Sequence, residues 1–145
     1  MKALIKIKMF GGECMKYMIP APKECVEQTN LFRWAAYESG KYPVLNLMYH
    51  APNGGKRDKI TAARLKAEGV KAGVPDIFLP AARGGFHGLY IELKRLKGNK
   101  TTAEQDQWLK DLNEQGYCAI VCRGWEEAAN KILEYLGEKP EGDLI

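Results

Sequence analysis

Residues 74–94 read VPDIFLPAARGGFHGLYIELK, and this stretch decides the fold. Its two ends, 74–80 and 88–94, are runs of apolar and aromatic residues with the composition and length of β-strands. The segment between them contains Gly84 and Gly85, which is typical of a hairpin loop. The stretch therefore predicts two antiparallel strands joined by a glycine-containing loop.

The two predicted strands have unlike faces. Symmetric pairing about the loop places Asp76 opposite Glu92, and strand side chains alternate between the two faces of a sheet. One face then carries only apolar side chains: Ile77, Leu79, Leu89, Ile91 and Leu93. The opposite face carries Asp76, Phe78, Tyr90, Glu92 and Lys94. The apolar face predicts the core side of a sheet, and the other face is a candidate site.

Two carboxylates and a lysine meet on that second face. Carboxylates directly opposite one another in a sheet repel by up to ~1 kcal/mol. Mg²⁺ would remove the repulsion, since it takes oxygen ligands and typically binds one or two carboxylates plus substrate phosphate. With Lys94 beside Asp76 and Glu92, such a site suits phosphodiester hydrolysis, which needs an activated water and a cation for the developing charge. The alternative is three exposed strand residues joined by a salt bridge.

Other segments extend this hairpin into one domain. The predicted order is helix, strand, short helix, strand, strand, helix, strand, helix, which gives a small mixed sheet flanked by helices in the α/β or mixed α+β class. The elements outside the hairpin are a helix at 23–38, a strand at 43–50, a basic helix at 58–68, a helix capped by Thr101 or Thr102, a strand at 117–122 and a helix at 125–136. Residues 1–22 form an N-terminal strand-like extension, 23–137 the domain and 138–145 a tail that we expect to fray.

Composition sets the broad class. With 145 residues, 46% of them apolar and 28% charged, the chain is typical of one globular domain. No apolar run approaches the length of a membrane span. The net charge of +4 permits a nucleic-acid partner without requiring one. Four cysteines and no export signal lead us to expect a reducing cytoplasm.

A family resemblance adds to this interpretation. Pro75-Asp76 and Glu92-Leu93-Lys94 read as PD…ExK, the signature of the PD-(D/E)xK nuclease superfamily. The stretch from Asn53 to Gly98 resembles the VRR-NUC domain, the virus-type replication-repair nuclease. The resemblance covers roughly residues 24–136. Outside that central stretch it rests on Glu24, Cys25, Val26, Glu27 and Gln28, on Leu31 and Trp34, and on Gln105 and Trp108.

The resemblance implies a restriction-endonuclease-like core and metal-dependent cleavage of DNA, often branched or flap DNA, in replication, repair or recombination. It implies Mg²⁺ or Mn²⁺ held by Asp76, Glu92 and the backbone carbonyl of Leu93, with Lys94 as the catalytic lysine. Similar small nucleases often act as homodimers, and the setting would be a prokaryotic or phage-infected cell. The rival hypothesis is a nucleic-acid-binding module that has lost catalysis. The presence of all three core residues argues against that rival.

Two further site residues follow from the family pattern. The family carries a glutamate in its first helix, for which Glu24 and Glu27 are both candidates as catalytic residues. On a helical wheel Glu24 lies on the inward stripe and Glu27 at its edge, which favours Glu24 as a further metal ligand. Gln105 matches the family's glutamine after ExK, but it equally suits a capping box with Thr102.

A basic segment precedes the hairpin and is a candidate DNA-binding surface. Its backbone amides and cations could contact phosphates in a sequence-independent, salt-sensitive way, although a solvated helix face is the ordinary alternative. The candidate residues are Asn53, Lys56, Arg57, Arg64 and Lys71, with Lys59 and Lys66 between them. His50 and His87 lie near the site in sequence, and we expect structural roles for both.

Overall fold

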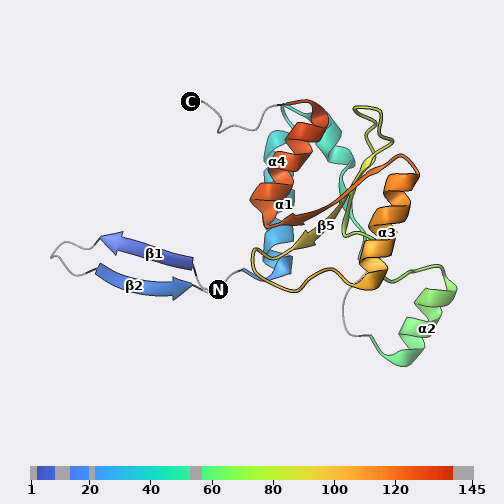
Figure 1. The fold of residues 1–145 in the computed structure, drawn as a ribbon, viewed down its shortest axis with the longest axis horizontal. Helices are drawn as coiled ribbons and strands as arrows, with labels where there is room; N and C mark the ends of the chain where they lie inside the picture. Colours follow the sequence, from blue (N-terminus) through green and yellow to red (C-terminus); the bar gives the residue numbers. More distant parts are fainter. Residues whose placement is uncertain (1–2, 9–13, 20–21, 53–56, 139–145) are drawn as a thin grey trace.

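The computed structural model describes residues 3–8, 14–19, 22–52 and 57–138. Its centre is a mixed four-stranded sheet flanked by helices (Figure 1), which confirms the predicted fold class and element order. The strands lie in the order β3 (Tyr49–His50), β4 (Ile77–Leu79), β5 (Leu89–Lys94) and β6 (Cys118–Arg123). The first three are antiparallel and β6 runs parallel to β5. The helices are α1 (Glu24–Glu38), α2 (Lys59–Ala67), α3 (Ala103–Glu114) and α4 (Trp125–Leu136).

The hairpin has the predicted register. Phe78 pairs with Tyr90, and the neighbouring pairs are Ile77 with Ile91 and Leu79 with Leu89. The strand β4 is shorter than expected, so Asp76 directly precedes it and does not lie in mid-strand. The predicted apolar face is buried throughout: Ile77, Leu79, Leu89, Ile91 and Leu93 are each at most 1% exposed.

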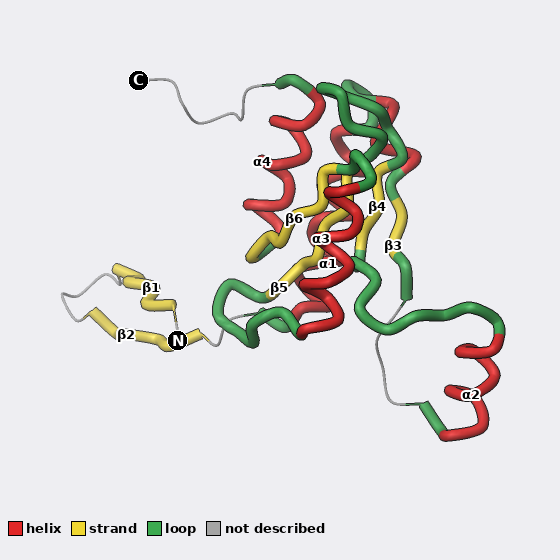
Figure 2. The backbone as a smooth tube through the Cα atoms, turned by 45° about the vertical axis from the view of Figure 1, so that its right-hand side comes forward, coloured by secondary structure: helices red, strands yellow, loops and turns green. Residues whose placement is uncertain are grey.

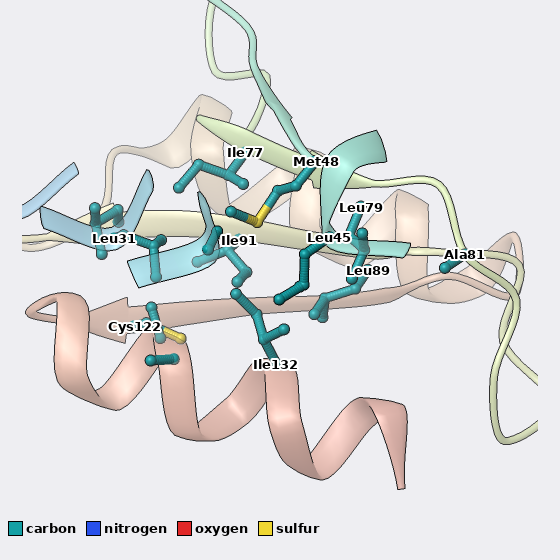
Figure 3. Close-up of a cluster of buried hydrophobic side chains, with 14 residues drawn as sticks. Leu31, Leu45, Met48, Ile77, Leu79, Ala81, Leu89, Ile91, Cys122 and Ile132 are labelled. Carbon is teal, nitrogen blue, oxygen red and sulfur yellow. The ribbon is translucent and has the colours of Figure 1, made fainter. Parts of the chain in front are cut away.

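Helices α1 and α4 cover this apolar face and contact one another. Figure 3 shows Leu31 of α1 and Ile132 of α4 in the same cluster as Ile91 of β5. Apolar burial of this kind is the main favourable contribution to folding. Helices α1 and α4 thus cover one face of the sheet. Helix α3 packs against β6 on the other side.

The segment 43–50 differs from its prediction as one strand. Residues Pro43–Leu47 form a 3₁₀ helix, and only Tyr49 and His50 are a strand. Pro43 begins the turn, because its fixed φ suits a first helical position. Leu45 and Met48 are then buried at a spacing of three residues, the repeat of a 3₁₀ helix.

The N-terminal segment also holds more structure than expected. Strand β1 (Ala3–Lys8) pairs with a second strand, β2 (Cys14–Ile19), as a separate antiparallel sheet. The sequence predicted a strand-like extension over residues 1–22 but not its division into two paired strands. Residues 14–19, CMKYMI, are apolar with one lysine, and a short run of that kind lacks the alternation that identifies a half-buried strand.

Candidate functional site

Asp76 is held from both neighbouring strands. Its side-chain Oδ2 accepts a hydrogen bond of 2.9 Å from the backbone N–H of Leu93 in β5. Its carbonyl oxygen accepts from the backbone N–H of Ala51 at 2.8 Å and lies 2.8 Å from Nδ1 of His50. Continuing the β4–β5 register by one residue places Asp76 opposite Glu92. The predicted pairing of the two carboxylates is therefore present.

Glu92 is buried at the centre of the site, with 1% of its surface exposed. Its Oε1 accepts a hydrogen bond of 2.6 Å from Nε2 of Gln105 and lies 3.1 Å from Nζ of Lys94. Its Oε2 is buried and has no hydrogen-bond partner. A buried acceptor without a partner is costly and uncommon. The alternative of an exposed strand residue is wrong for Glu92.

The environment disfavours charge on both carboxylates. Burial raises the pKa of Glu92 to about 7, and the nearby Asp76 adds to the increase, while the hydrogen bond with Lys94 opposes it. Burial also raises the pKa of Asp76, against the hydrogen bond from the Leu93 N–H and the charge of Lys94. Paired carboxylates with raised pKa values are typical of functional sites. They are also expected wherever two anions lie together with no cation between them.

The donor set fits a hard divalent cation. The unpartnered Oε2 of Glu92 and the carboxyl group of Asp76 offer two oxygen ligands at one place, and a bound cation would favour the charged form of both. Across the described ranges, no group of three or more His, Cys, Asp and Glu side chains is placed to hold a metal. The remaining ligands would be the Leu93 carbonyl, waters and substrate, together with Glu24 if its exposed carboxylate turns toward the cation. That partial set suits Mg²⁺, which usually keeps several waters.

Gln105 combines the two roles that its sequence position suggested. Its side-chain Oε1 accepts from the backbone N–H of Thr102 at 2.9 Å, which completes the capping box of α3. Its Nε2 donates to Glu92. The cap thus fixes the amide that orients Glu92, so the start of α3 positions the site.

The two first-helix glutamates have different surroundings. Glu24 is exposed, and burial raises its pKa, with Lys94 opposing and Asp76 adding to the increase. Its carboxylate therefore lies within electrostatic range of the site. Glu27 is 2% exposed, and its Oε2 accepts a 2.8 Å hydrogen bond from the backbone N–H of Trp125. The helical wheel was wrong in placing Glu27 at the edge of the buried stripe.

The basic segment is separate from the core. Helix α2 stands apart from the sheet in both views (Figures 1 and 2), and none of its residues is buried. Arg57, Lys66 and Lys71 line one groove of about 670 Å³ beside it. Arg64 instead lies 3.8 Å from Glu68 as an exposed ion pair. Lys59 is exposed as well, and Asn53 and Lys56 lie outside the described residues.

Two contacts that position Asp76 were not predicted from the sequence. His50 bonds to the Asp76 carbonyl, although it is far away along the chain. Trp108 of α3 donates from Nε1 to the carbonyl of Ala72 at 3.0 Å, which anchors the segment leading to Asp76. Both contacts join residues far apart in sequence, so only a known tertiary arrangement identifies them.

No helix in the described part of the chain is both long enough and apolar enough to cross a bilayer.

Comparisons with known proteins identify a matching family and a similar solved fold. The sequence profile described as "VRR-NUC domain" matches residues 24–126. A solved structure described as "VRR_NUC domain protein" superimposes with a TM-score of 0.71 at 32% identity, over 81% of this chain and 91% of that one. No curated protein sequence matches the chain.

Proposed function

The chain belongs to the VRR-NUC domain family, whose domains are of nuclease type, and on that premise we propose that it is a metal-dependent DNA endonuclease. The bond hydrolysed is a phosphodiester, and the substrate is branched or flap DNA. Mg²⁺ or Mn²⁺ is the metal. The observation that supports the proposal best is the buried Glu92, which has an unpartnered oxygen beside Asp76.

The side chains of the site have distinct tasks. Asp76 and Glu92 would hold the cation, with the backbone carbonyl of Leu93. A bound cation polarises the phosphate and lowers the pKa of a coordinated water. Lys94, 8% exposed and with its Nζ 3.1 Å from Glu92, lies beside the pair, where it can offset the charge that develops on phosphate. Gln105 fixes the orientation of the Glu92 carboxylate.

A cleavage panel tests this function. Flaps, four-way junctions, single strands and duplexes are incubated with Mg²⁺, Mn²⁺, Ca²⁺ or excess chelator. We expect cutting of branched DNA with Mg²⁺ or Mn²⁺ and none with chelator, while Ca²⁺ should bind without comparable turnover. Robust cleavage in chelator would contradict the metal mechanism. Binding of all substrates without cleavage under any condition would favour the rival, a silent DNA-binding module.

Two variants separate the tasks of Lys94 and Asp76. Lys94→Met should lower the cleavage rate by at least about a hundredfold, as loss of one charge-stabilising group does. It should retain the increase in melting temperature on adding Mg²⁺, because Lys94 is not a ligand. Asp76→Asn should lose both the cleavage and that increase. Lys110→Met, an exposed lysine on α3, is the control and should cut at the parent rate. Parent-rate cleavage by Lys94→Met would exclude the assigned role.

A further inference from the structure

A row of aromatic rings crosses the sheet on the same side as the carboxylates. Tyr49 pairs with Phe78 across β3 and β4, and Phe78 pairs with Tyr90 across β4 and β5. The Tyr49 and Phe78 rings meet edge-on at 5.8 Å, and the Phe78 and Tyr90 rings stack at 4.2 Å. Tyr117 closes the row, with its ring 5.3 Å from that of Tyr90. We call these four residues the aromatic row.

The aromatic row is the neighbour of the candidate site. Asp76 precedes Phe78 by two residues, and Glu92 follows Tyr90 by two residues. Side chains two apart on a strand share a face and are about 7 Å apart. The rings and the carboxylates therefore form successive rows on one side of the sheet.

This side of the sheet is only partly covered. Helices α1 and α4 pack on the opposite face, and α3 contacts the sheet at β6. Tyr49, at the β3 end of the row, is 52% exposed. The Phe78 ring packs directly over Gly88. A Cβ at Gly88 would lie only 2.7 Å from the Phe78 Cε2 atom, so this close packing requires glycine. The Phe78 ring at the centre of the row is therefore packed in place, whereas the Tyr49 ring at its end is accessible to solvent.

We propose that the open end of the aromatic row, the exposed Tyr49 ring, is a stacking platform for an unpaired base of the DNA strand whose phosphate lies at Asp76 and Glu92, because the Phe78 and Tyr90 rings already stack on each other. This inference rests on the proposed nuclease function. Every base has a π-face, and stacking on aromatic side chains is tolerant of sequence. Bases inside a duplex are already stacked on each other and do not offer that face. The platform therefore selects strands with unpaired nucleotides next to the cleaved bond.

Position identifies the occupant as nucleic acid. The row is one side chain wide and leads directly to two carboxylates, where a phosphate would bind through a cation. An aromatic surface that leads to a phosphate site suits a nucleotide chain, because such a chain carries a base beside each phosphate.

Binding to the Tyr49 variants tests the platform. Affinity is measured with Ca²⁺ for a single strand, a flap and a blunt duplex, each carrying 2-aminopurine in place of a base beside the expected cut. We expect Tyr49→Ala to bind the single strand and the flap about tenfold more weakly, the scale of losing one stacked base. Tyr49→Leu should match it, since leucine is apolar without a π-face. Tyr49→Phe should bind like the parent and quench 2-aminopurine equally.

The controls make the outcomes distinct. Tyr37→Ala removes an 84% exposed tyrosine from α1 and should change nothing. All variants should bind the duplex alike. Unchanged affinity in Tyr49→Ala, or an equal loss for duplex and single strand, would overturn the platform even if the parent cleaves DNA. A Tyr49-dependent preference for unpaired strands in a parent that never cleaves would instead refute the nuclease and retain the platform.

Discussion

At the scale of single residues, the central feature is a carboxylate that the fold does not fully satisfy. Glu92 is fixed by Gln105 and Lys94 through one oxygen, and its other oxygen is buried near Asp76 without a hydrogen-bond partner. A protein gains nothing in stability from such an arrangement, because burial disfavours the charged form. A bound cation would remove the penalty, so we interpret the penalty as a cost retained for function.

This interpretation gives a pH dependence with a definite sign. The pKa of Glu92 is 4.5 when unperturbed and about 7 in the fold. Between those values the unfolded chain loses its proton and the folded chain keeps it, so stability falls as pH rises. In chelator, the free energy of unfolding should fall from pH 5 to pH 8 by up to about 3 kcal/mol. Urea titrations at each pH would measure it.

Two comparisons control that measurement. Glu92→Gln should lose most of the decrease, because an amide does not titrate and still accepts from Gln105. Glu114→Gln, an exposed change on α3, should retain the decrease. Saturating Mg²⁺ should restore stability at pH 8 in the parent and in Glu114→Gln, but not in Glu92→Gln. A stability that is flat with pH in the metal-free parent would contradict the buried, partnerless state of Glu92.

At the scale of elements, α2 is a helix without a core. It has nine residues, none buried, and isolated helices of that length are marginal in water. Local contacts support it: the Asp58 side chain accepts from the Thr61 N–H at 2.9 Å, and Arg64 pairs with Glu68. A cationic helix standing off the core suits a contact with a phosphate backbone more than a role in packing.

The salt dependence of DNA binding should therefore depend on α2 and the segment after it. Lys66→Gln with Lys71→Gln should reduce the slope of log affinity against log salt by roughly two, because each lysine would neutralise one phosphate. Both lysines line the groove that Arg57 also lines. Fluorescence anisotropy with Ca²⁺ from low to moderate salt measures the slope. The double variant Lys110→Gln, Lys131→Gln removes two exposed charges elsewhere and should leave it unchanged. Equal slopes in the two double variants would place the DNA on another surface.

At the scale of the whole molecule, Glu27 joins the two ends of the domain. It lies on α1, and its carboxylate accepts from the first backbone N–H of α4, 98 positions later. Gly124, which precedes that N–H, has a φ of 82°, and a Cβ there would lie 2.8 Å from the Leu96 Cδ2 atom, so this turn into α4 requires glycine. An anion at a helix N-terminus satisfies an unpaired donor and interacts favourably with the helix dipole.

Replacing the two first-helix glutamates should consequently have opposite effects: loss of Glu27 should lower stability, and loss of Glu24 should lower cleavage. Glu27→Ala strands a buried donor, so it should cost about 1–3 kcal/mol of stability while cleavage by the folded protein continues. Glu27→Gln keeps an acceptor and should cost less. Glu24→Ala should leave stability nearly unchanged, because Glu24 is exposed, and should reduce cleavage. Melting curves beside cleavage rates measure both. If the Glu27→Ala protein is folded but inactive, the role of the family's first-helix glutamate belongs to Glu27 and not to Glu24.

Local sequence patterns predicted much of this molecule. The apolar alternation of the hairpin strands predicted the core face and the β4–β5 register, since strand side chains alternate and one face must be buried. The spacing of Thr102 and Gln105 predicted the capping box of α3, because that motif is made within four residues. The PD…ExK pattern led to the family to which the chain belongs.

Contacts between distant residues decided the rest. Nothing in the sequence near Glu92 indicates that one of its oxygens is buried without a partner, and nothing near Glu27 indicates that it caps α4. The aromatic row is assembled from residues 49, 78, 90 and 117. Periodicity reports which side of an element faces inward, since that depends on a few neighbouring residues. Which groups then meet depends on how the elements pack, and packing is a property of the whole chain.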